Sequence, residues 1–434
     1  MTQLYSEENA GNQMYKWASD LFPIARSITG NGVRTTLSYF KNNVIPNITV
    51  HEVPSGTKVF DWTIPDEWNV HEAWIEGPDG ARVVDFANHS LHLVGYSISV
   101  DISISLEALQ DHLHSLPDQP DAIPYVTSYY FPRWGFCMRH RDRLKLKAGM
   151  YRVHIDATLA PGSLTFGELI IPGESEKEVF LSTYICHPSM ANNELSGPCV
   201  TACLAKWLYM IPRRYTYRIV FVPETIGPIT YLSRNLDYLK QHVIAGYNIT
   251  CIGDDRNYSY LPSRNGNTLS DRIALHVLKY IAPHFKRYTF LDRGSDERQY
   301  CAPGVDLPVA TIMRSKYGEY PEYHTSLDDL TLVTTKGLEG GFLALKKAIE
   351  MIEADCIPQV TVLCEPQLGR RGLYRSLSIK PVDEVTQVML NLIAYSDGKH
   401  SLFEIAEIIE KPMWELVQVI QQLTKIGLID AKYP

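Results

Sequence analysis

Residues 183–197 read TYICHPSMANNELSG and place His187 directly after a strand-like apolar run. Three other short segments also carry a residue that could bind a metal or move a proton: VPETIG carries Glu224, CIGDD carries Asp254, and YGEYPEYHTSLDDL carries His324. Zinc takes imidazole nitrogen and carboxylate oxygen as ligands, and a catalytic zinc site leaves one position open for water. A further carboxylate beside such a metal can take a proton from that water. These residues therefore predict a zinc-dependent hydrolytic site, with Glu224 as the general base.

Each segment also has an ordinary structural interpretation. A lone histidine is more often a packed residue, PET can begin a helix, and Asp-Asp is common in turns. Ser182 and Ser196 lack a G-x-S-x-G turn, which disfavours a serine hydrolase. Cys186 is adjacent to His187, and neighbours on an extended chain point to opposite faces, which disfavours a Cys–His pair. Only the four segments together favour a metal site.

The pattern between residues 165 and 355 supplies a framework that could position these segments. Strand-like runs alternate there with helical patterns, which is typical of a largely parallel sheet covered by helices on both faces. The expected strands are 178–185, 217–222 and 245–251, and the expected helices are 196–210, 227–240, 268–283 and 336–354. Because ligands collect outside the carboxyl ends of such strands, we expect His187, Glu224 and Asp254 to lie at one edge.

Two other regions have a different pattern of apolar and polar residues. From 51 to 164, short alternating runs are separated by turn-forming residues, which predicts an inserted β-rich domain. Residues 359–434 carry three amphipathic patterns followed by an extended end, the order of elements in a winged helix (helices at 382–394, 401–409 and 412–426). The sequence therefore predicts a catalytic domain of residues 1–50 and 165–358, interrupted by the insertion and followed by the winged helix.

The composition is that of an ordinary globular protein, with 45% hydrophobic and 21% charged residues and a formal net charge of −8. That modest charge gives no reason to expect nucleic acid or an anionic membrane as a partner. Neither a transmembrane run nor a signal peptide is predicted. Eight cysteines without a C-x-x-C pair fit a reducing cytoplasm, which is the expected compartment.

The charge of the predicted winged helix argues against a role in DNA binding. Residues 360–434 contain eight Lys and Arg and nine Asp and Glu, so the segment is slightly acidic. Duplex binding depends on neutralising phosphates, and a domain with that function is normally clearly basic. We therefore interpret this domain as a packing or oligomerisation module, and we expect a homo-oligomer without a nucleic-acid partner.

The order of the four segments resembles that of zinc exopeptidases of the bacterial leucyl aminopeptidase type. More closely, the chain resembles an uncharacterised bacterial family of aminopeptidase-like proteins with a β insertion and a C-terminal winged helix. The resemblance covers nearly the whole chain, through the stretches LFPIARSITGNGVR, VFDWTIPDEWNVHEAWI, IPYVTSYYFPRWGFC, TYICHPSMAN, VPETIG and YGEYPEYHTSLDDL. It implies a zinc-exopeptidase fold: a mixed α/β sheet with helices on both faces, the insertion and the winged helix.

The resemblance also implies roles for individual residues. Glu224 resembles the catalytic base, and the implied metal ligands are His187, Asn193, Asp254 and His324. Asn193 stands where a bridging aspartate is expected, and Thr225 stands where the broader family has a second metal-binding glutamate. An amide or hydroxyl oxygen cannot neutralise two dications as carboxylates do. We therefore expect one zinc ion, with two as the alternative, and Glu194 could replace Asn193 if the turn shifts by one residue.

Several residues could contact the substrate, which we expect to be a peptide or small amide. GSDERQY (294–300) resembles the family's Ser-Asp loop, which makes Asp296 and Arg298 candidates, and the phenol of Tyr320 could stabilise an oxyanion. Arg26 or Arg34 could hold a carboxylate near the site, the alternative being a simple helix–helix loop. Two other functions stay open: a catalytically degraded binding protein, and an effector-sensing regulator that uses its winged helix.

Overall fold

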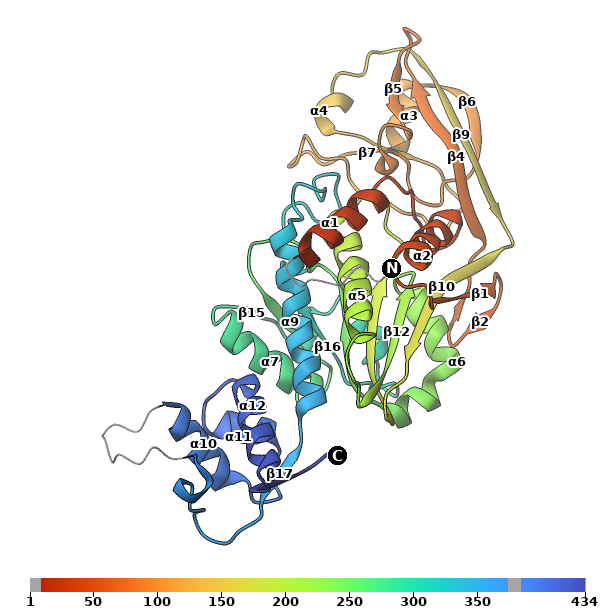
Figure 1. Cartoon of the computed structure of the whole chain (residues 1–434). Coiled ribbons are helices and arrows are strands. Elements are labelled where there is room, and N and C mark those ends of the chain that lie inside the picture. The colour runs from red at the N-terminus through yellow and green to blue at the C-terminus, as the bar shows by residue number, and fades with distance from the viewer. Residues whose placement is uncertain (1–8, 374–383, 434) are drawn as a thin grey trace. The chain divides into compact units, whose positions relative to one another are not determined.

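A computed structural model describes residues 9–373 and 384–433 of the chain (Figure 1). The chain forms two compact units: one comprises residues 1–271 and 284–343, and the other comprises residues 272–283 and 344–434. The first unit contains the large central sheet and the β-rich insertion, and the second contains the winged helix. No helix within the described residues is long and apolar enough to cross a membrane.

The central sheet is mixed, as expected. Its order is β1-β10-β12-β11-β13-β16-β14-β15, where the strands are β1 (Thr49–Pro54), β10 (Ser163–Ile171), β12 (Tyr215–Val222), β11 (Ser175–Tyr184), β13 (Val243–Asn248), β16 (Val309–Met313), β14 (Ser259–Leu261) and β15 (Lys286–Arg287). Strands β12, β11, β13 and β16 run parallel to one another. Strands β10 and β14 are antiparallel to their neighbours β12 and β16.

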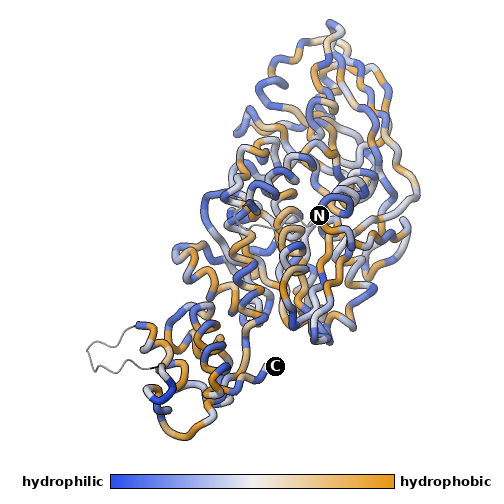
Figure 2. The backbone as a smooth tube through the Cα atoms, in the orientation of Figure 1, coloured by the Kyte–Doolittle hydropathy of each residue, from blue (hydrophilic) through white to orange (hydrophobic). Residues whose placement is uncertain are grey.

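The sequence of the parallel strands explains their central position. Every residue of β11 from Glu178 to Tyr184 is buried, which is the pattern of a strand covered by helices on both faces. Figure 2 shows hydrophobic residues concentrated in the central strands and in α5. The helices of this unit include α1 (Ala10–Leu21), α2 (Asn31–Asn43), α5 (Ser196–Leu208) and α6 (Ile226–His242), and α7 (Leu269–Ile281) and α9 (Thr335–Ala354) extend into both units. The mixed α/β fold expected from the sequence is confirmed.

The strands expected from the sequence did not include β10, β14, β15 or β16, and β1 was grouped with the insertion. The strand β16 was missed, because a run of five apolar residues cannot be distinguished from a buried loop or helix by periodicity. Strand β1 pairs with β10 at the edge of the central sheet, so residues 51–54, which the pattern grouped with the insertion, belong to the central sheet instead.

The β-rich insertion has its own antiparallel sheet, in the order β5-β4-β9-β6. Its strands are β4 (Glu67–Glu76), β5 (Arg82–Asp85), β6 (Val100–Ser105) and β9 (Met150–Ala160). A segment of this insertion also pairs with the loop that carries His324: the Tyr125 N–H donates to the His324 carbonyl at 2.9 Å, and the Ser326 N–H donates to the Ile123 carbonyl at 2.9 Å. The insertion therefore helps to hold the His324 loop in place.

The second unit has the elements of a winged helix, as expected. Its helices are α10 (Glu384–Tyr395), α11 (Leu402–Ile408) and α12 (Met413–Lys425), and β18 (Ile429–Lys432) pairs antiparallel with β17 (Ile357–Val360). Ser401 begins α11 with a capping box, in which its side chain and that of Glu404 each satisfy a backbone N–H. Residues 382 and 383, where the first helix was expected to begin, lie outside the described residues.

Candidate active site

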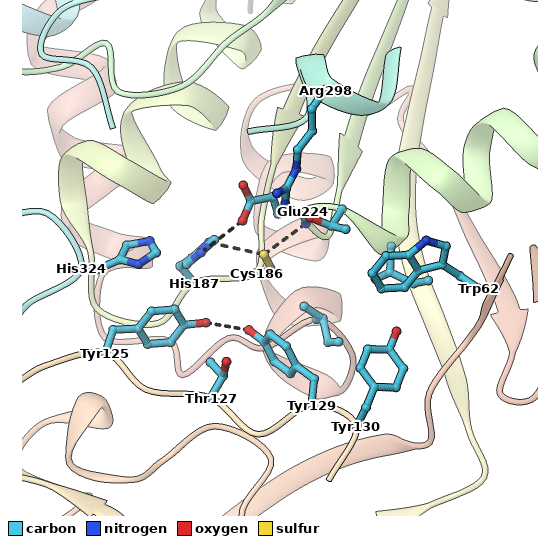
Figure 3. A pocket seen from close by; sticks show the side chains of 13 residues that line it. Trp62, Tyr125, Thr127, Tyr129, Tyr130, Cys186, His187, Glu224, Arg298 and His324 are labelled. Atoms are coloured by element: carbon cyan, nitrogen blue, oxygen red, sulfur yellow. Dashed lines mark hydrogen bonds and ion pairs between the residues drawn. The ribbon is translucent and has the colours of Figure 1, made fainter. Parts of the chain in front are cut away.

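The carboxyl ends of the parallel strands carry the predicted site residues. His187 follows β11, Glu224 follows β12, Asp254 follows β13, and the loop after β16 leads to His324. Because these four strands are parallel, their carboxyl ends meet at one edge of the sheet. His187, Glu224 and His324 line one pocket of about 450 Å³ (Figure 3). Asp254 does not line it.

A chain of charged groups runs from the interior to this pocket. Arg26 Nε lies 3.5 Å from Glu194 Oε1, Glu194 Oε2 lies 3.1 Å from His187 Nδ1, and His187 Nε2 lies 3.5 Å from Glu224 Oε2. Arg26 also donates to the His187 carbonyl at 3.0 Å. The alternative in which Arg26 holds a carboxylate near the site is therefore what the structure shows.

This chain sets the orientation and charge of His187. His187 Nδ1 lies 3.1 Å from Glu194 Oε2 and 3.4 Å from Cys186 Sγ, so the adjacent Cys186 and His187 do meet, and these contacts leave Nε2 facing Glu224. Burial opposes the charged form of the ring, but the hydrogen bond to Glu194 and the charge of Glu224 outweigh it and raise the pKa of His187. Burial also raises the pKa of Glu224, which brings this carboxyl closer to the range useful for a general base.

His324 is the second imidazole of the pocket. The centres of the His324 and His187 rings lie 5.3 Å apart, and Tyr323 stacks on His324 at 3.9 Å. Burial, assisted by the neighbouring His187, lowers the pKa of His324 to about 3. His324 Nε2 is buried without a hydrogen-bond partner. His324 therefore presents to the pocket a ring nitrogen that none of the described residues engages.

Asp254, a predicted ligand, is placed differently from the others. Each of its oxygens accepts two hydrogen bonds: Oδ2 from the Asn192 amide and the Ser315 N–H, and Oδ1 from the Ser315 hydroxyl and the Arg256 N–H, all between 2.9 and 3.0 Å. The side chain is fully buried. This carboxylate is thus occupied in holding three loops together, and a metal there would have to displace these donors.

The turn between β11 and α5 carries the two candidates for the bridging position. Residues Ala191–Leu195 form a π-helical turn, a geometry that recurs at functional sites. Asp328 fixes it by accepting the backbone N–H groups of residues 191, 192 and 193. Asn193 Oδ1 and Glu194 Oε1 are both buried without a hydrogen bond. Asp328 therefore supports the turn.

Of the three residues expected to contact the substrate, one lines the pocket and two lie outside its lining. Arg298 lines the pocket and donates to the Thr225 hydroxyl at 2.6 Å. Asp296 is buried behind Thr225 and accepts the Thr225 N–H at 2.8 Å, and burial raises its pKa well above the ordinary value. Tyr320 does not line the pocket, because its hydroxyl donates to Asp328 at 2.8 Å. Of these three residues, only Arg298 faces the pocket.

The opposite wall of the pocket is aromatic and comes from the insertion. Trp62, Tyr125, Tyr129 and Tyr130 line it, and the hydroxyls of Tyr125 and Tyr129 share a hydrogen bond of 2.7 Å (Figure 3). The sequence reasoning missed these four residues as parts of the site. The three tyrosines stand in the aromatic-rich stretch IPYVTSYYFPRWGFC and Trp62 stands in VFDWTIPDEWNVHEAWI, but neither stretch showed which edge of the central sheet it would face.

Strained backbone marks the same region. Ser189, Thr225 and His324 have φ values of 44°, 66° and 54°, in the left-handed region that residues other than glycine rarely adopt. Such conformations cost on the order of 1–3 kcal/mol each and cluster at functional sites. All three lie in loops at the carboxyl edge of the sheet, where surrounding hydrogen bonds hold them.

The donor atoms at the pocket and directly behind it are of the kinds that bind zinc. Ligand atoms of Cys186, His187 and Glu194 lie within 4.8 Å of one another, and this is the one such group among the described residues. Imidazole nitrogen and carboxylate oxygen suit zinc, and His324 Nε2, Asn193 Oδ1 and Glu194 Oε1 are buried polar atoms that lack a hydrogen bond. Burial raises the pKa of the Cys186 thiol, and its sulfur accepts the Glu224 N–H at 3.2 Å.

A mixed sheet of this topology with a histidine–glutamate pocket at its carboxyl edge defines an aminopeptidase-like fold. The zinc aminopeptidase BSAP from Bacillus subtilis superimposes with a TM-score of 0.58 at 10% identity, over 81% of this chain and 96% of that one. The aminopeptidase of Aneurinibacillus sp. strain AM-1 gives a TM-score of 0.51 at 11% identity, over 80% and 96%. At these identities the likeness concerns the fold.

The chain belongs to the family described as "Domain of unknown function (DUF4910)", whose model matches residues 15–355. A winged helix-turn-helix model matches residues 356–431. A Clostridium acetobutylicum protein named "Putative polysaccharide biosynthesis protein with aminopeptidase-like domain" is 42% identical over 407 residues, 93% of this chain and 92% of the relative. A crystal structure described as a "putative peptidase" from that species has a TM-score of 0.92 at 39% identity, over 98% of both chains. The expected aminopeptidase-like family with a winged helix is confirmed.

Proposed function

We propose that this protein is a zinc-dependent hydrolase of a peptide or small amide, with Glu224 as the general base. The observation that carries the proposal is the convergence of His187, Glu224 and His324 in one pocket, with Glu194 bonded to His187 from behind. The pocket holds two imidazoles and a half-buried carboxylate, which are the groups that this chemistry requires. The aminopeptidase-like fold supports the same conclusion.

The proposed ligands of a single zinc ion are the pocket-lining imidazoles of His187 and His324, and Glu194 orients the His187 ring from behind. The amide oxygen of Asn193 is a further candidate, because it is buried without a partner. When bound, zinc would supply a Lewis acid that polarises the amide carbonyl and lowers the pKa of a water molecule. Asp254 enters this set only if its four hydrogen bonds are broken. Thr225 is engaged by Arg298, which favours one ion over two.

Glu224 is suited to move the proton in this reaction. Water adds to the carbonyl carbon, Glu224 accepts the proton that the water loses, and the C–N bond breaks as that proton passes to the leaving nitrogen. Burial raises the pKa of Glu224, which strengthens it as a base. The hydroxyls of Tyr125 and Tyr129 line the same pocket, where one of them can donate to the oxygen of the former carbonyl.

The test is the isosteric variant Glu224→Gln, assayed on a panel of small amides and dipeptides with zinc content measured in parallel. We expect turnover to fall by at least about 100-fold, because a carboxamide cannot accept the proton. Zinc should stay bound, since Glu224 is not a proposed ligand. Glu322→Gln is the matched control, because Glu322 pairs with Arg256 at the surface, outside the pocket lining. Retained turnover in Glu224→Gln would remove Glu224 from the base role.

The zinc content of the purified protein is a second test of the proposal. Protein purified without chelators should hold close to one equivalent of zinc by elemental analysis. A content below about a tenth of an equivalent, with no gain of activity on adding zinc, would favour the alternative of a degraded binding protein. We also propose that the protein is cytoplasmic and forms a homo-oligomer. The location is supported by the described cysteines, which form no disulfides.

We propose that the winged helix packs or assembles the protein and does not bind DNA. Within α12, the helix in the position of a recognition helix, Lys425 at the C-terminal end is the sole cation. The nearby Lys411 is paired with Glu384. In an electrophoretic shift assay at about 150 mM salt, we expect no retardation of duplex DNA at micromolar protein. Specific retardation would revive the regulator alternative.

A further inference from the structure

The Arg298 side chain is a cation in the pocket wall that forms no direct ion pair among the described residues, although its charge acts on the nearby carboxyls of Glu224 and Asp296. Its Nη2 donates to the neutral hydroxyl of Thr225, and its Nε is buried without a hydrogen-bond partner. Among the described residues no carboxylate lies within ion-pair distance of this guanidinium, whereas most other arginines near the sheet are paired. A guanidinium has five donors, so most of its capacity here is unused.

The surrounding structure fixes the guanidinium in this position. Arg298 lies in the short helix α8 (Glu297–Tyr300), and Asp296, directly before it, accepts the N–H of Thr225 at 2.8 Å. Thr225 is held at φ 66°, a conformation that a β-branched residue adopts only under constraint. The two hydrogen bonds therefore join the loop after β12 to α8 and aim the Arg298 side chain into the pocket (Figure 3).

The pocket around Arg298 has two chemically different sides. Arg298 and Glu224 lie on one side, and the rings of Tyr125, Tyr129 and Tyr130 lie on the other (Figure 3). The volume of about 450 Å³ is that of a site for a small molecule. A ligand there meets an aromatic surface, the carboxyl of Glu224 and an unpaired guanidinium. An ammonium group beside Arg298 would be repelled, whereas a carboxylate would receive charge-assisted hydrogen bonds.

We propose that the substrate is an amide with a free carboxylate, of the N-acyl amino acid type, and that Arg298 binds this carboxylate. The inference rests on the proposed hydrolase function, since the amide is placed at Glu224. It goes beyond that function, because it predicts that the substrate group beside Arg298 is a carboxylate and not an ammonium group. The acyl group packs against the aromatic wall. Arg298 acts as a specificity-determining residue.

The test compares two ligands that differ only in the carboxylate. N-benzoylglycine and its neutral amide, N-benzoylglycinamide, have the same benzoyl group for the aromatic wall. Their binding is measured by calorimetry on the full-length, zinc-loaded Glu224→Gln protein, in which turnover does not interfere. We expect N-benzoylglycine to bind at least tenfold more tightly than its amide. Glycinamide, which carries an ammonium group, should bind more weakly than either.

Variants of Arg298 then separate its role from that of the metal. In the same background, Arg298→Gln should reduce the tenfold preference to about one, and Arg298→Lys should retain part of it. Arg293→Gln is the control, because Arg293 is an exposed cation on the neighbouring loop outside the pocket lining. A preference that survives in Arg298→Gln would assign the carboxylate to the metal and overturn the proposal. Equal binding of the two ligands, or binding of neither, would also overturn it.

Failure of the inference and failure of the proposed function give different results. Hydrolysis by the unmodified protein is measured on both ligands and on glycinamide. Arg298-dependent binding of N-benzoylglycine without hydrolysis of any amide leaves the carboxylate site standing and removes the hydrolase. Hydrolysis that favours glycinamide, and that is unchanged by Arg298→Gln, keeps the hydrolase and rejects the carboxylate site.

Discussion

Two buried carboxylates at the carboxyl edge of the sheet, Asp254 and Glu194, differ in how their oxygens are used. Both side chains are fully buried. The oxygens of Asp254 accept four hydrogen bonds, whereas Glu194 has one hydrogen bond to His187 and an oxygen that is only 3.5 Å from Arg26. A buried carboxylate with all its lone pairs engaged is a structural element, and one left partly unsatisfied has capacity for a ligand. We therefore predict that zinc binding depends on Glu194 and not on Asp254.

The largest expected effect concerns the cation that balances Glu194. Arg26→Met leaves the Glu194 carboxylate buried without its counter-ion, and we expect the free energy of unfolding to fall by about 3–5 kcal/mol. Urea unfolding of the metal-free protein measures it. The double variant Arg26→Met/Glu194→Met removes both charges and should recover much of that loss. Equal destabilisation by the single and double variants would show that the ion pair itself is not the cause.

The isosteric pair Glu194→Gln and Asp254→Asn tests the comparison directly. We expect Glu194→Gln to weaken zinc binding by about 10–100-fold, through loss of the carboxylate that orients His187. Asp254→Asn should change zinc affinity less than threefold, but it should lower the unfolding free energy, because an amide NH₂ would face existing donors. Competition with a chromogenic chelator and urea unfolding give the two quantities. The opposite pattern would restore Asp254 as a ligand.

Asp328 offers a smaller test, because it resembles Asp254 in being saturated with hydrogen bonds. Its oxygens accept three backbone N–H groups from the turn before α5 and the hydroxyl of Tyr320. Asp328→Asn should cost about 1–3 kcal/mol of unfolding free energy. Because the turn carries Glu194, zinc affinity should fall as well, by less than in Glu194→Gln. Tyr320→Phe, which removes one of the four donors, should cost less again. A loss of zinc without a loss of stability would mean that Asp328 itself contacts the metal.

The sequence by itself determined the framework and the chemical character of the site. Continuous apolar runs alternating with helical patterns specify a parallel core, because only strands covered on both faces lack polar positions. The residues after those runs, His187 and Glu224, could be placed at one edge since parallel strands end together. The amphipathic patterns after residue 380 likewise specified the winged helix.

The tertiary structure alone decided which of those residues share a pocket. Asp254 and Glu194 each follow a strand of the central sheet in the sequence. Ser315, which donates a hydrogen bond to Asp254, and Arg26, which forms an ion pair with Glu194, lie far away along the chain. The aromatic wall comes from an insertion whose approach to His324 depends on a short backbone pairing at Tyr125. Local patterns contain no information on such long-range contacts, because side-chain spacing specifies a face of an element and not what packs against that face.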